Sequence, residues 1–280
     1  ANLDGADLNG VTGAQFQGAL NVSAKFLKNC RSCDFRGAAL SGVDLSEALL
    51  TDADLREADM QGANLALANL ANANLTQVNL TQANLRGAYL AKVNLAGANL
   101  AQANLSGANL VQANLKNANL ANANLTQVTL SEANLNGANL EGAWMNGVNL
   151  EKARLVGANL NGAKLSTANL AGSHMPGANL EGADLAEANL EGANLAEADL
   201  TQANLSMADL SGSYMLGTNL EGAKLADADL TQANLAEVAV PESTTPLLSG
   251  QPGTLHRIPA YVAWLRWVGL IFCLTLMASA

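Results

Sequence analysis

Residues 103–120 read ANLSGANLVQANLKNANL, and a leucine falls on every fifth position of this stretch. The same spacing runs without a slip from Phe35 to Leu235, where 36 of the 41 central residues are Leu. The residue two places before the central one is Ala in 32 of these 41 units, and nowhere is it larger than Val. The chain therefore alternates one bulky and one small side chain with a fixed period of five.

A period of five fits neither standard element of secondary structure. On an α-helix it advances about 500° per unit and spreads the leucines around the whole circumference. On a straight strand, residues five apart point to opposite faces. The period is accommodated when the chain turns a corner in every unit, so that four short extended segments close one coil with the leucine and the small residue inside. Stacked about 4.8 Å apart, roughly ten such coils predict a parallel β-helix about 50 Å long.

Individual units also resemble a known motif. Ala-Asn-Leu-Thr-Gln at 73–77, Ala-Asn-Leu-Ser-Gly at 103–107 and Ala-Asp-Leu-Ala-Glu at 183–187 are similar to the A-(D/N)-L-x-x motif of pentapeptide-repeat proteins, cyanobacterial members included. The resemblance covers residues 35–238 and implies an all-β fold, a right-handed quadrilateral parallel β-helix. It specifies the fold and not an activity, because the family includes topoisomerase-protecting DNA mimics and many proteins whose roles are unassigned.

Three segments lie outside the regular run. Residues 1–34 keep the repeat with two changes of phase, and we expect the second, at Asn29 to Ser32, to bulge outward at a corner as part of irregular first coils. Residues 239–257 are rich in Ser, Thr, Pro and Gly and are typical of a flexible linker. Residues 258–280 are mostly apolar and predict a C-terminal hydrophobic helix that anchors the chain in a membrane.

The flanking charges orient this predicted anchor. His256, Arg257 and Arg266 lie on its N-terminal flank, and Arg266 inside the apolar zone would extend its head toward the interface. Basic residues on that flank place the rod on the cytoplasmic side of the membrane. An interfacial amphipathic helix or an oligomerisation helix is the alternative for the segment, and a soluble cytoplasmic or exported protein is the alternative for localisation.

Two of the three cysteines, Cys30 and Cys33, stand at the change of phase before Phe35. Cys33 occupies the inward position that Ala holds elsewhere, so we expect a free, buried thiol that packs as a small hydrophobe. A disulfide with Cys30 is the alternative. A metal site is disfavoured, because zinc needs four ligands and no second cluster of Cys or His is in view.

Positions 20 apart stack in a column on one side of the rod, and the residue before each central leucine is usually Asn or Asp. One column is interrupted over four consecutive layers, with Arg154, His174, Asn194 and Tyr214, of which only Asn194 follows this rule. Exposed Arg and Tyr are enriched at binding hot spots, so this column is a candidate protein-binding patch, with a neutral interruption as the alternative. We expect a neighbouring face to carry Trp144 and Lys164, either as part of a binding surface or as local packing.

Composition narrows the function further. The net charge of −10 argues against direct binding of nucleic acid, which requires clustered Lys and Arg. No spacing poises a nucleophile and an acid beside His174, and glycines such as Gly182 serve corners and not a phosphate loop. We therefore predict that the chain is not an enzyme and holds no cofactor or metal.

Charge is uneven along the axis, since residues 181–240 hold eleven acids against Lys224 alone. We expect a non-enzymatic scaffold or protein-interaction module, membrane-tethered through 258–280, whose protein partner is unidentified and which can form homo-oligomers. The alternative is an acidic DNA mimic that binds a topoisomerase or another DNA-binding protein.

Overall fold

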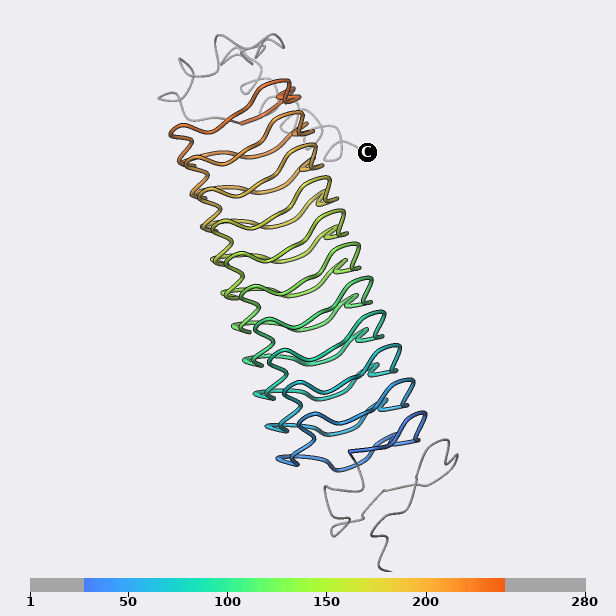
Figure 1. Ribbon diagram of the computed structural model, residues 1–280. Helices are drawn as coiled ribbons and strands as arrows, with labels where there is room; N and C mark the ends of the chain where they lie inside the picture. Colours follow the sequence, from blue (N-terminus) through green and yellow to red (C-terminus); the bar gives the residue numbers. More distant parts are fainter. Residues whose placement is uncertain (1–27, 240–280) are drawn as a thin grey trace, which may run out of the picture.

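A computed structural model describes residues 28–239, which wind into a long four-sided rod (Figure 1). Parallel bridges join each residue before a central position to the residue 20 positions later, from Asn29↔Leu49 to Asn219↔Ala239. Each side of a coil contributes a single bridge residue, so the described residues contain isolated bridges and corners but neither a helix nor a longer strand. The prediction of a stacked four-sided coil is confirmed.

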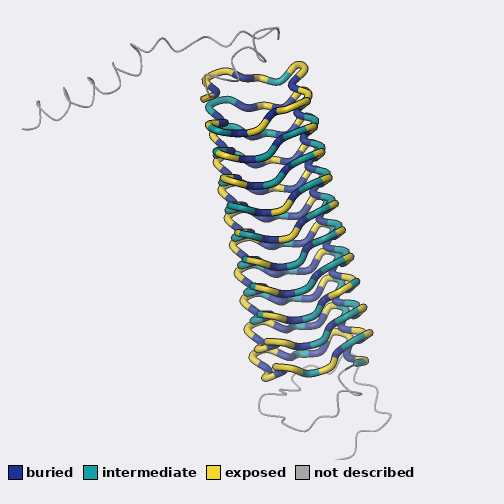
Figure 2. Tube along the Cα trace, turned by 90° about the vertical axis from the view of Figure 1, so that its left-hand side faces the viewer, coloured by how far each residue is buried: buried dark blue, intermediate teal, exposed yellow. Residues whose placement is uncertain are grey.

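The side chains that point toward the axis of the rod form a continuous apolar core. Figure 2 shows that buried positions recur in every coil. Every central residue from Leu45 to Leu220 is at most 1% exposed, and the small residues such as Ala103 fill the space between them. Burying one leucine side chain in this way stabilises the fold by about 1.5–3 kcal/mol. At the last coil the core becomes slightly accessible, because Leu225 and Leu230 reach 8% and 7% exposure.

Backbone hydrogen bonds hold each layer to the next in both directions. The N–H of Leu105 donates to the carbonyl of Asn124 at 2.8 Å, and the N–H of Asn109 donates to the carbonyl of Ala88 at 3.0 Å. The same two bonds recur along the described rod, so the stacked layers behave as parallel strands that are each only about one residue long.

The corners are tight turns that the backbone closes within one unit. The N–H of Ala108 donates to the carbonyl of Leu105 at 2.9 Å, and the third residue of this turn, Gly107, has a φ of 68°. A positive φ at that position is what a type II turn requires, and glycine adopts it without steric cost. The expected role of the glycines at the corners is confirmed.

The remaining N–H of each unit explains the preference for Asn and Asp. The N–H of Ser106, just after Leu105, has no backbone acceptor in the ladder and donates to Oδ1 of Asn104 at 3.1 Å. The same bond caps the corner after Asn64, after Asn119 and after Asp209. Asn and Asp are favoured before the central leucine because their short side chains reach this donor.

We expect Asn104→Ala to lower the free energy of unfolding by about 0.5–1.5 kcal/mol, because it removes one side-chain acceptor and its hydrogen bond. Asn104→Asp keeps the acceptor oxygen and should cost less than half as much. Chemical denaturation of the three proteins under one set of conditions measures the difference. Equal losses for the Ala and Asp variants would contradict the capping role.

The regular register begins earlier than the sequence indicated. Asn29 bridges to Leu49, and the N–H of Ser32 donates to the carbonyl of Thr51 at 2.9 Å. Ser32 takes the corner conformation with a φ of 55°, and Cys30 fills the central inward position at 0% exposure. The expected outward bulge at Asn29 to Ser32 is therefore wrong, because Cys30 substitutes for the bulky central residue.

Predictions for residues 1–27 and 240–280 lie outside the described residues. The linker at 239–257, which shares only its first residue with the described rod, and the hydrophobic helix at 258–280 stay predictions. Within residues 28–239 there is no apolar helix of the length needed to cross a bilayer.

Candidate protein-binding surface

The structure places the four residues of the interrupted column directly above one another. Arg154 bridges to His174, His174 to Asn194, and Asn194 to Tyr214, all in parallel. We call the side of the rod that carries this column the Arg154 side. Arg154, His174 and Tyr214 are exposed, with Tyr214 at 40%, so a guanidinium, an imidazole and a phenol project from a backbone fixed by the layers.

Local contacts on the Arg154 side hold part of this column in place. Nδ2 of Asn194 lies 3.3 Å from Nδ1 of His174, which links two neighbouring layers. Oδ1 of Asn194 accepts from the N–H of Ala196 at 3.0 Å, as in an ordinary corner. Asn194 therefore keeps the capping role of the ladder and also orients the imidazole beside it.

Arg154 and His174 stand where Asn or Asp normally caps the N–H of the following corner, and each of these two corners compensates in a different way. The N–H of Val156, which follows Arg154, donates to Oδ1 of Asn136 in the layer below at 3.0 Å. The corner after His174 begins with Pro176, which has no N–H to cap and whose fixed φ suits this turn position. The sequence around the column is thus adapted to side chains that cannot serve as caps.

The core under the same side is also unusual. Ser173 and Ser213 take the inward position of Ala, are 1% exposed, and are the only described residues with a buried side-chain oxygen that has no hydrogen-bond partner. Each stands directly before an outward aromatic ring and a buried methionine, in Ser-His-Met and Ser-Tyr-Met at 173–175 and 213–215. The paired Ser and Met replacements are visible in the sequence, but the missing hydrogen-bond partners of the two hydroxyls appear only in the structure.

Replacing Ser213 with Ala should raise the free energy of unfolding by about 1 kcal/mol, since it removes a buried hydroxyl without a partner. Ser211→Ala in the same layer, at a corner where the side chain is partly exposed, should change it by less than about 0.5 kcal/mol. Thermal and chemical unfolding of both variants measure the two effects. A destabilised Ser213→Ala protein would show that the hydroxyl has a partner in solution.

Trp144 and Lys164 do not lie on a face that adjoins the Arg154 side. Their column is offset from that of Arg154 by 10 residues, which is two corners of a four-sided coil, so they occupy the opposite side. Trp144 is 59% exposed and bridges to Lys164, which bridges to Asp184. The expectation of a neighbouring face is wrong, and the two columns cannot contact one flat partner surface together.

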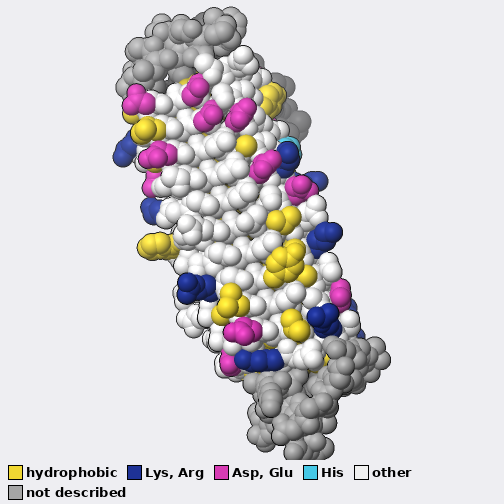
Figure 3. Space-filling view, in the orientation of Figure 1, with side chains coloured by type: hydrophobic (Ala, Val, Ile, Leu, Met, Phe, Trp, Pro, Cys, Tyr) yellow, Lys and Arg dark blue, Asp and Glu magenta, His cyan; other side chains and the backbone are white. Residues whose placement is uncertain are grey.

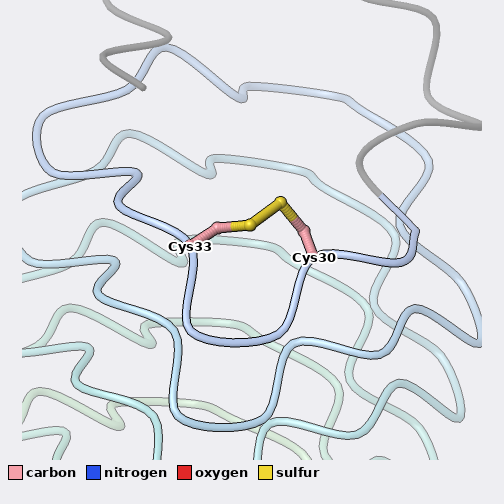
Figure 4. Close-up of a disulfide and its surroundings, with 2 residues drawn as sticks. All are labelled: Cys30 and Cys33. Atoms are coloured by element: carbon pink, nitrogen blue, oxygen red, sulfur yellow. A yellow bond between two sulfur atoms is a disulfide. The ribbon is translucent and has the colours of Figure 1, made fainter. Parts of the chain in front are cut away.

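The first coil holds a disulfide between Cys30 and Cys33 (Figure 4). Their Cα atoms are 5.4 Å apart across the corner formed by Arg31 and Ser32, and both side chains are buried. The expectation of a free thiol at Cys33 is wrong, although its inward position is confirmed. The described residues contain no cluster of three or more His, Cys, Asp or Glu suited to a metal ion.

Several charged side chains in the first coils form ion pairs. The guanidinium of Arg36 lies 2.6 Å from the carboxylate of Asp34, and this hydrogen bond lowers the pKa of Asp34 to about 2. Hydrogen bonds from Ser46, and then from Lys28, lower the pKa of Asp44 to about 2. These pairs lie at the same end of the rod as the disulfide.

These lowered pKa values predict a loss of stability in acid. A carboxyl group whose pKa is lower in the folded state stabilises the fold above its unfolded pKa of about 4, and this contribution disappears as the pH falls toward 2. The free energy of unfolding should therefore decrease between about pH 4 and pH 2. The double variant Asp34→Asn with Asp44→Asn should show a shallower decrease in denaturation midpoints over this range, and an unchanged slope would contradict the assignment.

The comparison with protein families agrees with this geometry. Eight copies of the pentapeptide-repeat family model match the chain in segments that together cover residues 29–238. The chain belongs to the pentapeptide-repeat family, and its rod is the right-handed quadrilateral β-helix of that family. No protein with a curated functional description matches the chain.

Several solved structures are similar, including cyanobacterial ones. HetL, a pentapeptide repeat protein involved in heterocyst differentiation regulation in Nostoc sp. strain PCC 7120, is 31% identical over 83% of this chain and 95% of its own, with a TM-score of 0.47. Rfr23 from Cyanothece 51142 is 30% identical over 48% of this chain and 91% of its own, with a TM-score of 0.24. QnrB1, a plasmid-mediated fluoroquinolone resistance protein, is 16% identical over 78% and 93%, with a TM-score of 0.36.

Proposed function

We propose that this protein is a non-enzymatic interaction module that presents the Arg154 side as a rigid docking surface for a protein partner. One observation supports this most directly: the amide ladder is interrupted there by an exposed Arg, His and Tyr in neighbouring layers. Arg and Tyr are the residue types that contribute most at protein interfaces. Proteins of the pentapeptide-repeat family are generally structural or interaction proteins, which supports the same conclusion.

The rigidity of the rod favours such a role. Side chains on this side project from backbone atoms that are held by ladder bonds above and below, so binding orders only the side chains themselves. Ordering a flexible side chain costs about 0.5–1.5 kcal/mol on association, whereas ordering a loop costs more. The buried Ser173 and Ser213 beneath the column support a surface shaped at some expense in stability.

Affinity capture from native membranes with the full chain tests the docking surface. We expect the double variant Arg154→Ala with Tyr214→Ala to retain less than a tenth of the partner bound by the wild type. Trp144→Ala with Lys164→Ala alters two large exposed side chains on the opposite side and should retain most of it. Equal capture by all three proteins would refute the Arg154 side as the binding surface.

We further propose that residues 258–280 tether the rod to a membrane, with the rod on the cytoplasmic side. The support is the apolar composition of the segment and the basic residues on its N-terminal flank. Fractionation of the full chain beside a chain that ends at Ala239 tests the tether. We expect detergent to be needed for the full chain only, and a full chain released by buffer alone would refute the tether.

A second candidate function is an acidic DNA mimic that occupies a topoisomerase. The supporting observation is the dense acidic end of the rod, in residues 181–240. There the corner acids lie on all four edges of the coil, namely Glu181 and Glu221, Glu187 and Asp227, Glu191, and Glu197 and Glu237. Inhibition or protection of a gyrase supercoiling reaction would support this function, and no effect at a large excess of protein would remove it.

A further inference from the structure

A second surface feature is independent of the Arg154 side. Leu49 and Tyr89 lie in one column, two layers apart, and are 36% and 47% exposed. Leu67 lies at a corner of the layer between them and is 64% exposed. Its side chain extends over Gly87 in the next layer, so that a Cβ placed on this glycine would lie 2.8 Å from Cδ2 of Leu67. We call the side of the rod that carries this column, together with its two corners, the Tyr89 side.

Basic side chains flank this apolar cluster. Arg86 and Lys92 lie at the two corners on either side of Tyr89, and both are exposed. Neither takes part in an ion pair within residues 28–239, so both charges are free to meet a partner. Around Leu67 and Tyr89 the Tyr89 side is therefore an apolar surface with a basic rim, and the exposed Glu47 and Asp52 lie at the same two corners nearer the N-terminus.

The C-terminal half of the same side has the opposite character. Met207 is 62% exposed and lies in the same corner column as Leu67 and Gly87, seven layers of 20 residues above Leu67 and six above Gly87. Glu187 and Asp227 lie one layer below and one layer above Met207, and Asp209 lies beside it. Figure 3 shows a face of the rod on which acidic side chains gather toward the upper, C-terminal end.

Gly87 and Met207 are 120 residues apart, which is six layers of 20 residues. The layer that contains Asn149 is thus midway between them, three layers from each. It is also midway between Tyr89 and Asp209, which lie three layers to either side of Asn149 in its own column. A two-fold rotation at the layer of Asn149 therefore exchanges the apolar, basic half of the Tyr89 side with its acidic half.

We propose that two copies of this chain pair side by side and antiparallel through their Tyr89 sides, with a two-fold axis at the layer of Asn149. In this register Met207 of one copy meets the glycine corner at Gly87 of the other, where the flexible thioether can pack on Leu67. Tyr89 faces Asp209, and Arg86 faces the corner between Glu187 and Asp227. Because the interface is isologous, each contact occurs twice.

Charge complementarity favours an antiparallel orientation and a second copy of this chain as the partner. A parallel pairing would place acidic end against acidic end, which is unfavourable, whereas the antiparallel pairing places each basic rim against an acidic one. Glu187 and Asp227, like Arg86, have no ion pair within the described residues. A second copy supplies an apolar side chain, Met207, with acids on both sides of it. It lies as far from the layer of Asn149 as the cluster around Tyr89 does in the opposite direction.

Sedimentation of the full chain over a range of concentrations, in a density-matched mild detergent, tests this pairing. We expect a dimer whose dissociation constant rises at least tenfold with Arg86→Glu and falls as the ionic strength is lowered. Lys116→Glu, an identical reversal of charge on another side, should leave the dissociation constant within about twofold. The combination of Arg86→Glu with Glu187→Arg and Asp227→Arg should restore dimerisation, because the reversed charges meet again across the axis.

Each other outcome overturns the proposal. A monomer at all concentrations would leave the cluster to a different protein, and a dimer indifferent to Arg86→Glu would place the contact elsewhere, for example in residues 240–280. Loss without recovery in the combined variant would exclude the antiparallel register. These results do not test the Arg154 side, because the affinity-capture experiment measures binding to that side independently of dimerisation.

Discussion

Leu105→Ala is expected to lower the free energy of unfolding by about 2–5 kcal/mol. Leu105 is 0% exposed in the middle of the rod, and its neighbours in the layers above and below are held by backbone bonds on both sides. The tube therefore cannot collapse into the space that the side chain leaves. Chemical denaturation followed by far-ultraviolet circular dichroism measures the loss.

The matched control for this variant is Leu67→Ala, the same substitution at a corner where the side chain is 64% exposed. It should change the free energy of unfolding by less than about 1 kcal/mol at a concentration where the protein is monomeric. Similar losses at Leu105 and Leu67 would contradict the assignment of inward and outward positions. Because each coil contacts only its neighbours, a broadened transition in Leu105→Ala would indicate that the rod unfolds in two parts.

Ala103→Phe should be at least as damaging, with an expected loss of about 3 kcal/mol or more. Ala103 is 1% exposed, and Ala83 and Ala123 occupy the same inward position in the adjacent layers at 1% and 0%. A phenyl ring has no free volume along this stack, so the strands of the coil would have to separate. Thermal unfolding and the loss of soluble folded protein measure the effect.

The control for overpacking is Thr129→Phe, which places the same ring at an outward position. The same position of the unit already holds Tyr89 in this column and Trp144 on another side of the rod, which are 47% and 59% exposed. The outward variant should stay within about 1 kcal/mol of the wild type. A tolerated phenylalanine at Ala103 would mean that the centre of the rod is not closely packed.

Much of the candidate surface could be placed from the sequence, because a column follows from counting 20 residues. Arg154, His174, Asn194 and Tyr214 are stacked in the order expected. The same counting, carried through two corners, would have placed Trp144 on the opposite side. The cap on Val156 and the usefulness of a proline at 176 could not be foreseen, because they matter only when the ladder leaves one N–H of each corner without a backbone acceptor.

The cysteines illustrate a different limit. Cys33 was correctly placed in the core, since its position relative to Phe35 matches that of Ala in other units. The disulfide depends on the 5.4 Å between two Cα atoms across a corner, and that distance exists only after the corner has formed. The sequence does not mark Cys30 as a central residue, because cysteine is much smaller than the leucine that normally occupies this position.

The five-residue period was sufficient to predict the four-sided coil and the inward positions, because whether a side chain points in or out depends on the alternation of the chain over two or three residues. The tertiary structure was needed for what depends on the closed corner and on the contact of one layer with the next: the distance that allows the disulfide, and the bond from Val156 to Asn136 in the layer below. The corner caps are local in sequence, but the N–H that each cap satisfies is left over only because the stacked layers pair the other backbone donors of the unit.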